Sequence, residues 1–413
     1  MKPVPKSERL KNVHYEIRGP VLAQARQLEA EGHHIIKLNL GNPGAFGFTA
    51  PQRIRQDMAD HLSEASGYSD SKGFIAVREA IQQMLAGRQI TGVTPDDIYV
   101  GNGVSELIMV AMQALLNPGD QVLIPAPDYP LWTAAVAFSG GMPVHYLCDE
   151  QSGWLPDLED MRARITPRTR ALVIINPNNP TGALYPVSLL RDLVELARTH
   201  ELIIFADEIY DQLIYDGASH TSVAALSNDV PTVTFCGLSK NYLACGYRAG
   251  WMAISGLAGV GRQCMRGYID GLNVISSMRL CSNVPGQYAI LGALKSGNSM
   301  AQALVAPGGR LFGQREQAVT QLNAIEGVSC VKPKAAFYLF VRLDPAWYPV
   351  KNDTRFVLDL LLQEHVLLVQ GSGFNWPRPD HFRLVFLPPV DELHEAITRI
   401  ARFLGRNRGR VVV

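Results

Sequence analysis

The chain has 413 residues, 47% of them apolar, which is enough for a buried core and for more than one usual domain length. Its 38 basic and 38 acidic residues cancel, and no basic block or tail is present, which argues against a nucleic-acid partner. No run approaches the roughly 18 apolar residues of a membrane span, and the N-terminus lacks the apolar stretch of a signal peptide, so no membrane association is expected.

Short apolar runs rich in β-branched residues predict buried strands, because both of their faces are apolar. In chain order these runs lie at 98–100, 121–125, 143–147, 171–175, 202–206, 232–236 and 251–254. Helical patterns separate several of them, as at 105–116 and 186–200. The alternation predicts an α/β fold in which helices cover a mostly parallel sheet, and we assign it to a large domain at 51–290.

After about residue 290 the pattern changes to a long amphipathic helix followed by "GVSCVKPKAAFYLFVRL". A further helix is expected around 354–364, then "HFRLVFLPP", then a last helix at 391–404. This order predicts a smaller α+β domain at 291–413, which the N-terminal segment 1–50 completes.

The six cysteines are scattered, without a C-x-x-C pair or histidines at ligand spacing. The pattern predicts neither a disulfide framework nor a metal site. We therefore expect reduced thiols in a cytoplasmic protein.

Polar residues follow five of the predicted strands, at the edge where open parallel sheets bind ligands. In chain order the segments are "GNGVSEL", "APDYPLW" with Tyr129, "NPNNPTG" with Asn179, "DEIYD" with Asp207 and Tyr210, and "GLSKNYLACGYRAGW" with Ser239, Lys240 and Arg248. Each of these features taken alone is also compatible with a turn, a packing aromatic or a surface charge. Asp207 is the most informative, because a carboxylate directly after a buried strand needs a cationic partner.

One ligand uses the whole set. Pyridoxal 5′-phosphate has a phosphate, a flat ring, a ring nitrogen, a phenolic oxygen and an aldehyde that condenses with an amine. Lys240 would form the Schiff base and then act as a base, and Asp207 would keep the ring nitrogen protonated. Asn179 and Tyr210 would bond the phenolic oxygen. The phosphate would be bound by Arg248, Ser239 and the helix start at Gly103, Val104 and Ser105.

The segments "NPNNPTG", "DEIYD" and "SKNYLACGYRAGW" resemble the signatures of the class I/II aminotransferases of fold type I, in that family's order and at its spacings. Within the family, "VHYEIRGPV", "KLNLGNPGAFGF" and "PAPDYPLW" are similar to alanine aminotransferases of the bacterial glutamate-pyruvate type. The resemblance implies ping-pong transfer of an α-amino group between amino acids and 2-oxo acids. The substrate pair it favours is L-alanine and 2-oxoglutarate, which give pyruvate and L-glutamate.

The resemblance also implies roles for residues outside the five segments. Arg383 would bind the substrate α-carboxylate, and the backbone at Gly41 would close on the same group. Tyr129 would stack on the cofactor ring. Tyr68 would reach across a homodimer interface to the partner's phosphate.

The segment "HYEIRGP" supplies Tyr15 and Arg18 as candidates for the second carboxylate of glutamate. Arg18 equally suits a structural ion pair that holds the N-terminal segment. Two departures from the family matter: Ala335 replaces a usual glycine, which puts the local backbone in question, and Cys245 replaces a frequent alanine, for which we expect a change of packing only.

Other reactions remain compatible with the same fold, because fold does not fix chemistry. They are transamination of aromatic or branched-chain amino acids, C–S lysis, decarboxylation and oxidation. A regulatory domain that only senses the cofactor is a non-enzymatic alternative, against which the lack of a basic face argues.

Overall fold

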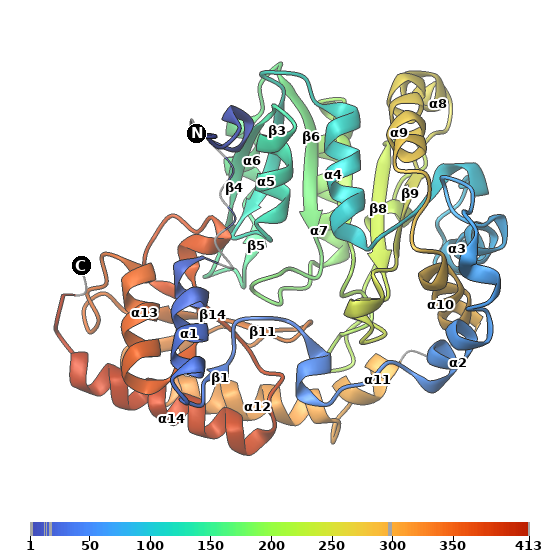
Figure 1. The fold of residues 1–413 in the computed structure, drawn as a ribbon. Helices are drawn as coiled ribbons and strands as arrows, with labels where there is room; N and C mark the ends of the chain where they lie inside the picture. The colour runs from blue at the N-terminus through green and yellow to red at the C-terminus, as the bar shows by residue number, and fades with distance from the viewer. Residues whose placement is uncertain (1–2, 12, 14, 16–18, 296–299, 412–413) are drawn as a thin grey trace.

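The computed structural model describes residues 3–11, 13, 15, 19–295 and 300–411, and in this part of the chain a large sheet lies in the upper part of the view, above the C-terminal elements (Figure 1). Its strand order is β2–β9–β8–β7–β6–β3–β4–β5. The strands are β2 (Ile98–Gly101), β3 (Gln121–Ala126), β4 (Met142–Asp149), β5 (Leu155–Pro156), β6 (Thr169–Ile175), β7 (Ile203–Asp207), β8 (Thr232–Gly237) and β9 (Gly250–Ser255). Every run predicted as a strand in 98–254 is one of them, which confirms the α/β prediction.

The sheet is mostly parallel, as predicted. Strands β8, β7, β6, β3 and β4 pair in parallel. Strand β9 runs antiparallel to both of its neighbours, so β2 points the same way as β8. The carboxyl ends of β2, β3, β6, β7 and β8 therefore meet at one edge.

Helices cover both faces of the sheet because successive side chains of its strands are apolar on both sides. Along β6, Val173 and Ile175 pack with one set of helices while Leu172 and Ile174 pack with the other. The first set is α4 (Val104–Leu115), α5 (Leu131–Phe138) and α9 (Arg266–Met278), and the second is α6 (Leu158–Arg164) and α7 (Val187–Thr199). At the β2–β9 end the cover comes from α2 (Gln52–Asp60), α3 (Ile75–Gly87) and α10 (Val284–Lys295), and the short α8 (Gly261–Cys264) precedes α9.

The C-terminal part has a sheet of its own, with strand order β10–β11–β14–β13 and antiparallel pairing. Its elements are β10 (Val328–Cys330), β11 (Tyr338–Leu343), β12 (Val366–Leu367), β13 (Val369–Gln370), β14 (His381–Val385), α11 (Met300–Val305), α12 (Arg310–Asn323), α13 (Asp353–Glu364) and α14 (Val390–Asn407). The N-terminal elements α1 (Pro20–Ala30) and β1 (Ile36–Lys37) lie among them, and β1 pairs with β12 (Figure 1).

This pairing supports the placement of segment 1–50 with the C-terminal unit, and the division into 1–50, 51–290 and 291–413 stays a proposal. The boundary at residue 290 falls inside α10, which packs against α2 and α3. The chain therefore leaves the large unit only beyond this helix.

Candidate active site

The carboxyl edge of the large sheet borders a cavity of about 530 Å³. Most of the predicted site residues line it, although they come from segments far apart in the chain: Tyr15, Gly41, Val104, Ser105, Tyr129, Asn179, Asp207, Tyr210, Ser239, Lys240, Arg248 and Arg383. Gly103 lies just outside the lining, at the start of α4, and Tyr68 is not part of it. Arg18 lies outside the described residues.

Lys240 follows β8 and projects into this cavity half-buried. Its Nζ donates to the carbonyl oxygen of Gly41 at 2.8 Å and lies 5.7 Å from the ring centroid of Phe337. The next residue, Asn241, is fully buried and donates to Asp211, which also bonds Arg88. These contacts fix the backbone from which the lysine extends.

Asp207 ends β7 and is only 3% exposed. Its carboxylate accepts from Trp132 Nε1 at 3.2 Å and from the backbone N–H of Ile209 at 3.4 Å. Burial raises the pKa of Asp207 to about 6, although these donors and the Lys240 ammonium lower it. The hydrogen bonds and Lys240 therefore offset only part of the cost of burying the charged carboxylate. A cation bound in the cavity would stabilise this charge.

Arg383, on β14, is buried and has one N–H donor without a partner. Its Nη1 donates to Asn179 Oδ1 at 3.1 Å and Nη2 to the carbonyl of Asn39, while the buried Nε has no partner. The guanidinium lies over the rings of Tyr338 (4.7 Å) and Phe374 (4.5 Å), and burial lowers its pKa. A buried cation with an unpartnered donor is suited to a carboxylate.

The far end of the cavity is an anion cradle built by α4 and Arg248. Gly103, with φ 83°, is the N-cap of α4, and its carbonyl accepts from the N–H of Glu106 at 3.2 Å. The N–H groups of Val104 and Ser105 come before any acceptor of the helix itself, as at every helix start. Arg248 donates to the carbonyls of Cys245 (2.8 Å) and Asn102 (3.1 Å). A Cβ at position 103 would lie 2.3 Å from Arg248 Nη2, so the glycine lets the arginine cross the helix start.

Two side chains of the site were not predicted from the sequence, Trp132 and Tyr338. Tyr338 lines the cavity, and its hydroxyl lies 2.6 Å from that of Tyr210. For Trp132 the signal was present in "APDYPLW", since a buried indole N–H needs an acceptor. Tyr338 gave no such signal, because an aromatic in an apolar strand is usually core.

The two departures from the family pattern have different outcomes. The prediction that Cys245 changes packing only is wrong, because its thiol lines the cavity and donates to Asn42 Oδ1 at 3.2 Å. Ala335 is buried without a positive φ, whereas the next residue, Ala336, takes φ 60°. The methyl group at 335 therefore does not strain its own backbone.

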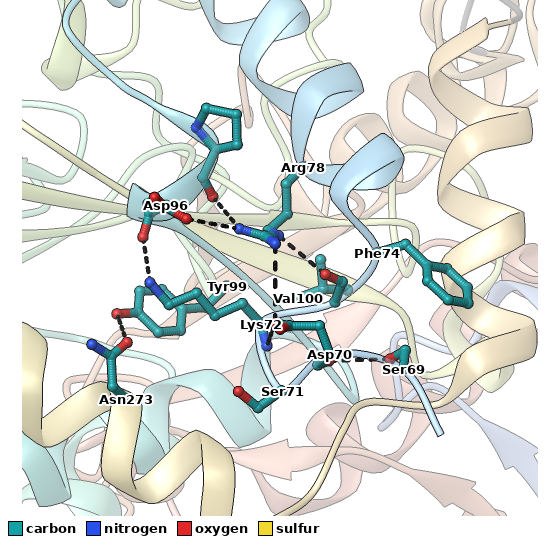
Figure 2. A network of polar contacts seen from close by, with 12 residues as sticks. Ser69, Asp70, Ser71, Lys72, Phe74, Arg78, Asp96, Tyr99, Val100 and Asn273 are labelled. Atoms are coloured by element: carbon teal, nitrogen blue, oxygen red, sulfur yellow. Dashed lines mark hydrogen bonds and ion pairs between the residues drawn. The ribbon is translucent and has the colours of Figure 1, made fainter. Parts of the chain in front are cut away.

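Tyr68 is 82% exposed, on a segment that a polar network holds in place (Figure 2). Within the segment, the backbone N–H of Lys72 donates to Asp70 at 2.8 Å. Its ammonium donates to the carbonyl of Asp96 at 2.7 Å, and Arg78 donates to the Asp96 carboxylate at 3.3 Å. These bonds tie the segment to Asp96 and to α3, and the Tyr68 side chain is left exposed.

The residues that the structure describes contain no group of three or more His, Cys, Asp or Glu side chains placed to hold a metal. No helix among them is long and apolar enough to cross a bilayer.

A helix-covered parallel sheet with a lysine, a buried carboxylate and two arginines around one cavity defines an α/β enzyme of the fold-type I group. The sequence pattern described as "Aminotransferase class I and II" matches residues 33–400, and the chain belongs to this family. It is 56% identical to the glutamate-pyruvate aminotransferase AlaA of Escherichia coli K12, over 98% of this chain and 99% of that protein. It is 54% identical to the alanine aminotransferase of Mycobacterium tuberculosis, over 96% and 92%.

Solved structures agree with this assignment. An aminotransferase from Escherichia coli superposes with a TM-score of 0.95 at 56% identity, covering 98% of this chain and 99% of that one. The alanine aminotransferase from Pyrococcus furiosus gives a TM-score of 0.89 at 37% identity, covering 97% and 100%.

Proposed function

We propose that this aminotransferase uses pyridoxal 5′-phosphate to move an amino group from L-alanine to 2-oxoglutarate. The observation that carries the proposal is the convergence of Lys240, Asp207, Arg248 and Arg383 on one cavity. The residues present fit the cofactor at both ends. The buried Asp207 carboxyl, with its raised pKa, suits a protonated ring nitrogen as partner. A Cβ at position 103 would clash with Arg248, so the glycine keeps this cation at the start of α4, where it would bind a phosphate.

When bound, the cofactor supplies an aldehyde that condenses with amines and a protonated ring that withdraws electrons from the substrate Cα. Lys240 would hold the aldehyde and, with its amine free, would move a proton at the substrate Cα. Asp207 would keep the ring nitrogen protonated, and Tyr129 would pack on the ring. Asn179 and Tyr210 would bond the phenolic oxygen.

The remaining polar groups bind the anions of cofactor and substrate. Arg248, Ser239, Ser105 and the backbone N–H of Val104 would hold the phosphate. Arg383 takes the α-carboxylate through its unpartnered donor. Both amino acids and 2-oxo acids carry this carboxylate, so one site serves both half-reactions in a ping-pong sequence.

The choice of alanine and 2-oxoglutarate is supported by the names of relatives that are 54% and 56% identical over nearly the whole chain. Tyr15 lies at the cavity with its hydroxyl 3.1 Å from that of Tyr129, so the N-terminal segment reaches the substrate space. We propose Tyr15 and Arg18 as contacts for the second carboxylate of glutamate. The ion-pair role of Arg18 is the alternative that the Arg18 variant described below distinguishes.

The active form we propose is a cytoplasmic homodimer. Exposed apolar side chains gather near Tyr68: Met278 is 79% and Leu280 56% exposed, and between them Arg279 donates to the carbonyl of Ser71 at 2.7 Å. A second copy related by a two-fold axis would cover this surface and bring Tyr68 to the partner's phosphate site.

The experiment is a panel of amino donors against pyruvate and 2-oxoglutarate, combined with the absorbance of the purified protein. We expect a yellow protein that prefers alanine, and a Lys240→Ala variant that still binds some cofactor but does not transaminate. A colourless protein that cannot be reconstituted would refute the cofactor assignment. A preference for tyrosine, phenylalanine or valine, or release of a thiol by elimination, would refute the substrate assignment.

A further inference from the structure

Tyr338 contacts two side chains of the proposed site, Tyr210 and Arg383. It lies on β11, is 2% exposed, and places its hydroxyl 2.6 Å from that of Tyr210. Its ring faces the guanidinium of Arg383 at 4.7 Å. A Cβ at Gly41 would lie 2.3 Å from the Tyr338 hydroxyl, so the backbone there closes over it. Packing on all sides fixes the position of this phenol.

The direction of the Tyr210–Tyr338 hydrogen bond follows from counting protons. Each phenol has one O–H donor, and the hydroxyl of each is the other's partner in the structure. If Tyr210 donates to a ligand in the cavity, its oxygen must accept from Tyr338. Burial raises the pKa of Tyr210, which keeps its proton in place for donation. Chains of donors strengthen one another in a low dielectric.

We propose that Tyr338 is a positioning residue: it donates to Tyr210, which directs the Tyr210 proton to the cofactor's phenolic oxygen, and its ring aligns Arg383 for the substrate carboxylate. The inference rests on the proposed function. Tyr338 belongs to the C-terminal sheet, and Tyr210 follows β7 of the large sheet. The hydrogen bond between their hydroxyls therefore also links the two sheets at the cavity.

The test is a spectroscopic titration of the protein loaded with pyridoxal phosphate. A donor to the phenolic oxygen opposes uptake of a proton by the lysine-bound cofactor, so losing it raises the midpoint pH of the absorbance change. Tyr210→Phe should raise the midpoint most. Tyr338→Phe should raise it by a smaller amount, roughly 0.3–1 pH unit, because one neutral hydrogen bond behind the donor is lost.

The double variant decides whether Tyr338 acts through Tyr210. In a Tyr210→Phe background, Tyr338→Phe should cause no further shift. Tyr215→Phe is the matched control, because Tyr215 is also buried and its hydroxyl donates to the Ala336 carbonyl at 2.8 Å, outside the cavity lining. It should leave the midpoint unchanged while lowering the melting temperature of cofactor-free protein about as much as Tyr338→Phe does.

Two substitutions of different size distinguish the contact of the Tyr338 ring with Arg383 from the hydrogen bond of its hydroxyl to Tyr210. Tyr338→Phe keeps a ring over the guanidinium, so KM for alanine and 2-oxoglutarate should change less than about threefold, whereas Tyr338→Leu should raise KM for both by roughly fivefold. An unchanged midpoint in Tyr338→Phe, or an equal shift in both backgrounds, would overturn the proposal. A wild type that cannot be loaded with pyridoxal phosphate would instead refute the proposed function.

Discussion

The replacement of Asp207 by asparagine should stabilise the cofactor-free protein and weaken the loaded one. The folded state raises the pKa of this buried carboxyl from 3.8 to about 6. Since the folded pKa is the higher one, the carboxyl favours folding fully below pH 3.8, and this contribution is lost as the pH rises through 6. At about 1.4 kcal/mol per pH unit, the carboxylate costs on the order of 3 kcal/mol above pH 7.

Denaturant unfolding of cofactor-free protein measures this cost. Asp207→Asn should gain up to ~3 kcal/mol over the wild type at pH 8, and about half of that at pH 5, less the weakening of the bond from Trp132. With cofactor bound, Asp207→Asn should be less stable than the wild type, because the variant loses its charge partner for the ring nitrogen. Its turnover should fall far more than its substrate affinity.

Asp128→Asn is the matched control for the reversal. Asp128 is also buried, with a pKa raised to about 7 by desolvation, but it bonds Thr133 and Asn375 and does not line the cavity. Its replacement should stabilise loaded and cofactor-free protein alike. If Asp207→Asn destabilised the cofactor-free protein equally at pH 5 and pH 8, or if both variants behaved alike on loading, the assignment of Asp207 as the ring-nitrogen partner would fail.

Three further predictions concern anion binding, assembly and the backbone. Arg383→Gln should lower kcat/KM for all four substrates by at least ~100-fold, while Arg18→Gln should raise KM more than about tenfold for glutamate and 2-oxoglutarate only; a uniform loss in Arg18→Gln would favour its ion-pair role. Mixing Tyr68→Phe with inactive Lys240→Ala subunits should raise activity above that of Tyr68→Phe alone, since each mixed dimer has one complete site, and an active monomer in sedimentation would contradict this. Ala335→Gly should lower the free energy of unfolding by about 0.5–1 kcal/mol, because residue 335 has no positive φ that glycine would relax, while glycine makes the unfolded chain more flexible. A stabilised variant would contradict that account.

The sequence alone could predict the parts of the site that the parallel sheet brings together. Asp207 ends its strand, and Asn179 and Lys240 follow theirs; the three strands run in the same direction, so these residues share one edge of the sheet. Short runs that are apolar on both faces leave little choice but a buried strand. The direction of β9 could not be predicted in this way, since a short apolar run looks the same whether its strand is parallel or antiparallel to its neighbours.

Contacts between the two sheets were harder to foresee. Tyr338 and Arg383 lie on adjacent strands of the C-terminal sheet, and whether they reach Tyr210 depends on how that sheet docks on the large one. Arg383 could be assigned only through the family resemblance. Cys245 was misjudged for a related reason, because its partner Asn42 comes from the N-terminal segment, about two hundred residues away in the chain.

The electrostatics of the cavity explain why one chain would accept two ligands in succession. Burial raises the pKa of Asp207 and lowers that of Arg383, so each charge is disfavoured in the empty protein. A cation at Asp207 and a carboxylate at Arg383 would each remove such a cost, and the two groups belong to different molecules. Cofactor and substrate should therefore stabilise the fold in two separate steps, with the second depending on Arg383 and not on Asp207. We expect the melting temperature to rise on adding pyridoxal phosphate, and to rise again with a non-reactive carboxylate analogue in the wild type but not in Arg383→Gln.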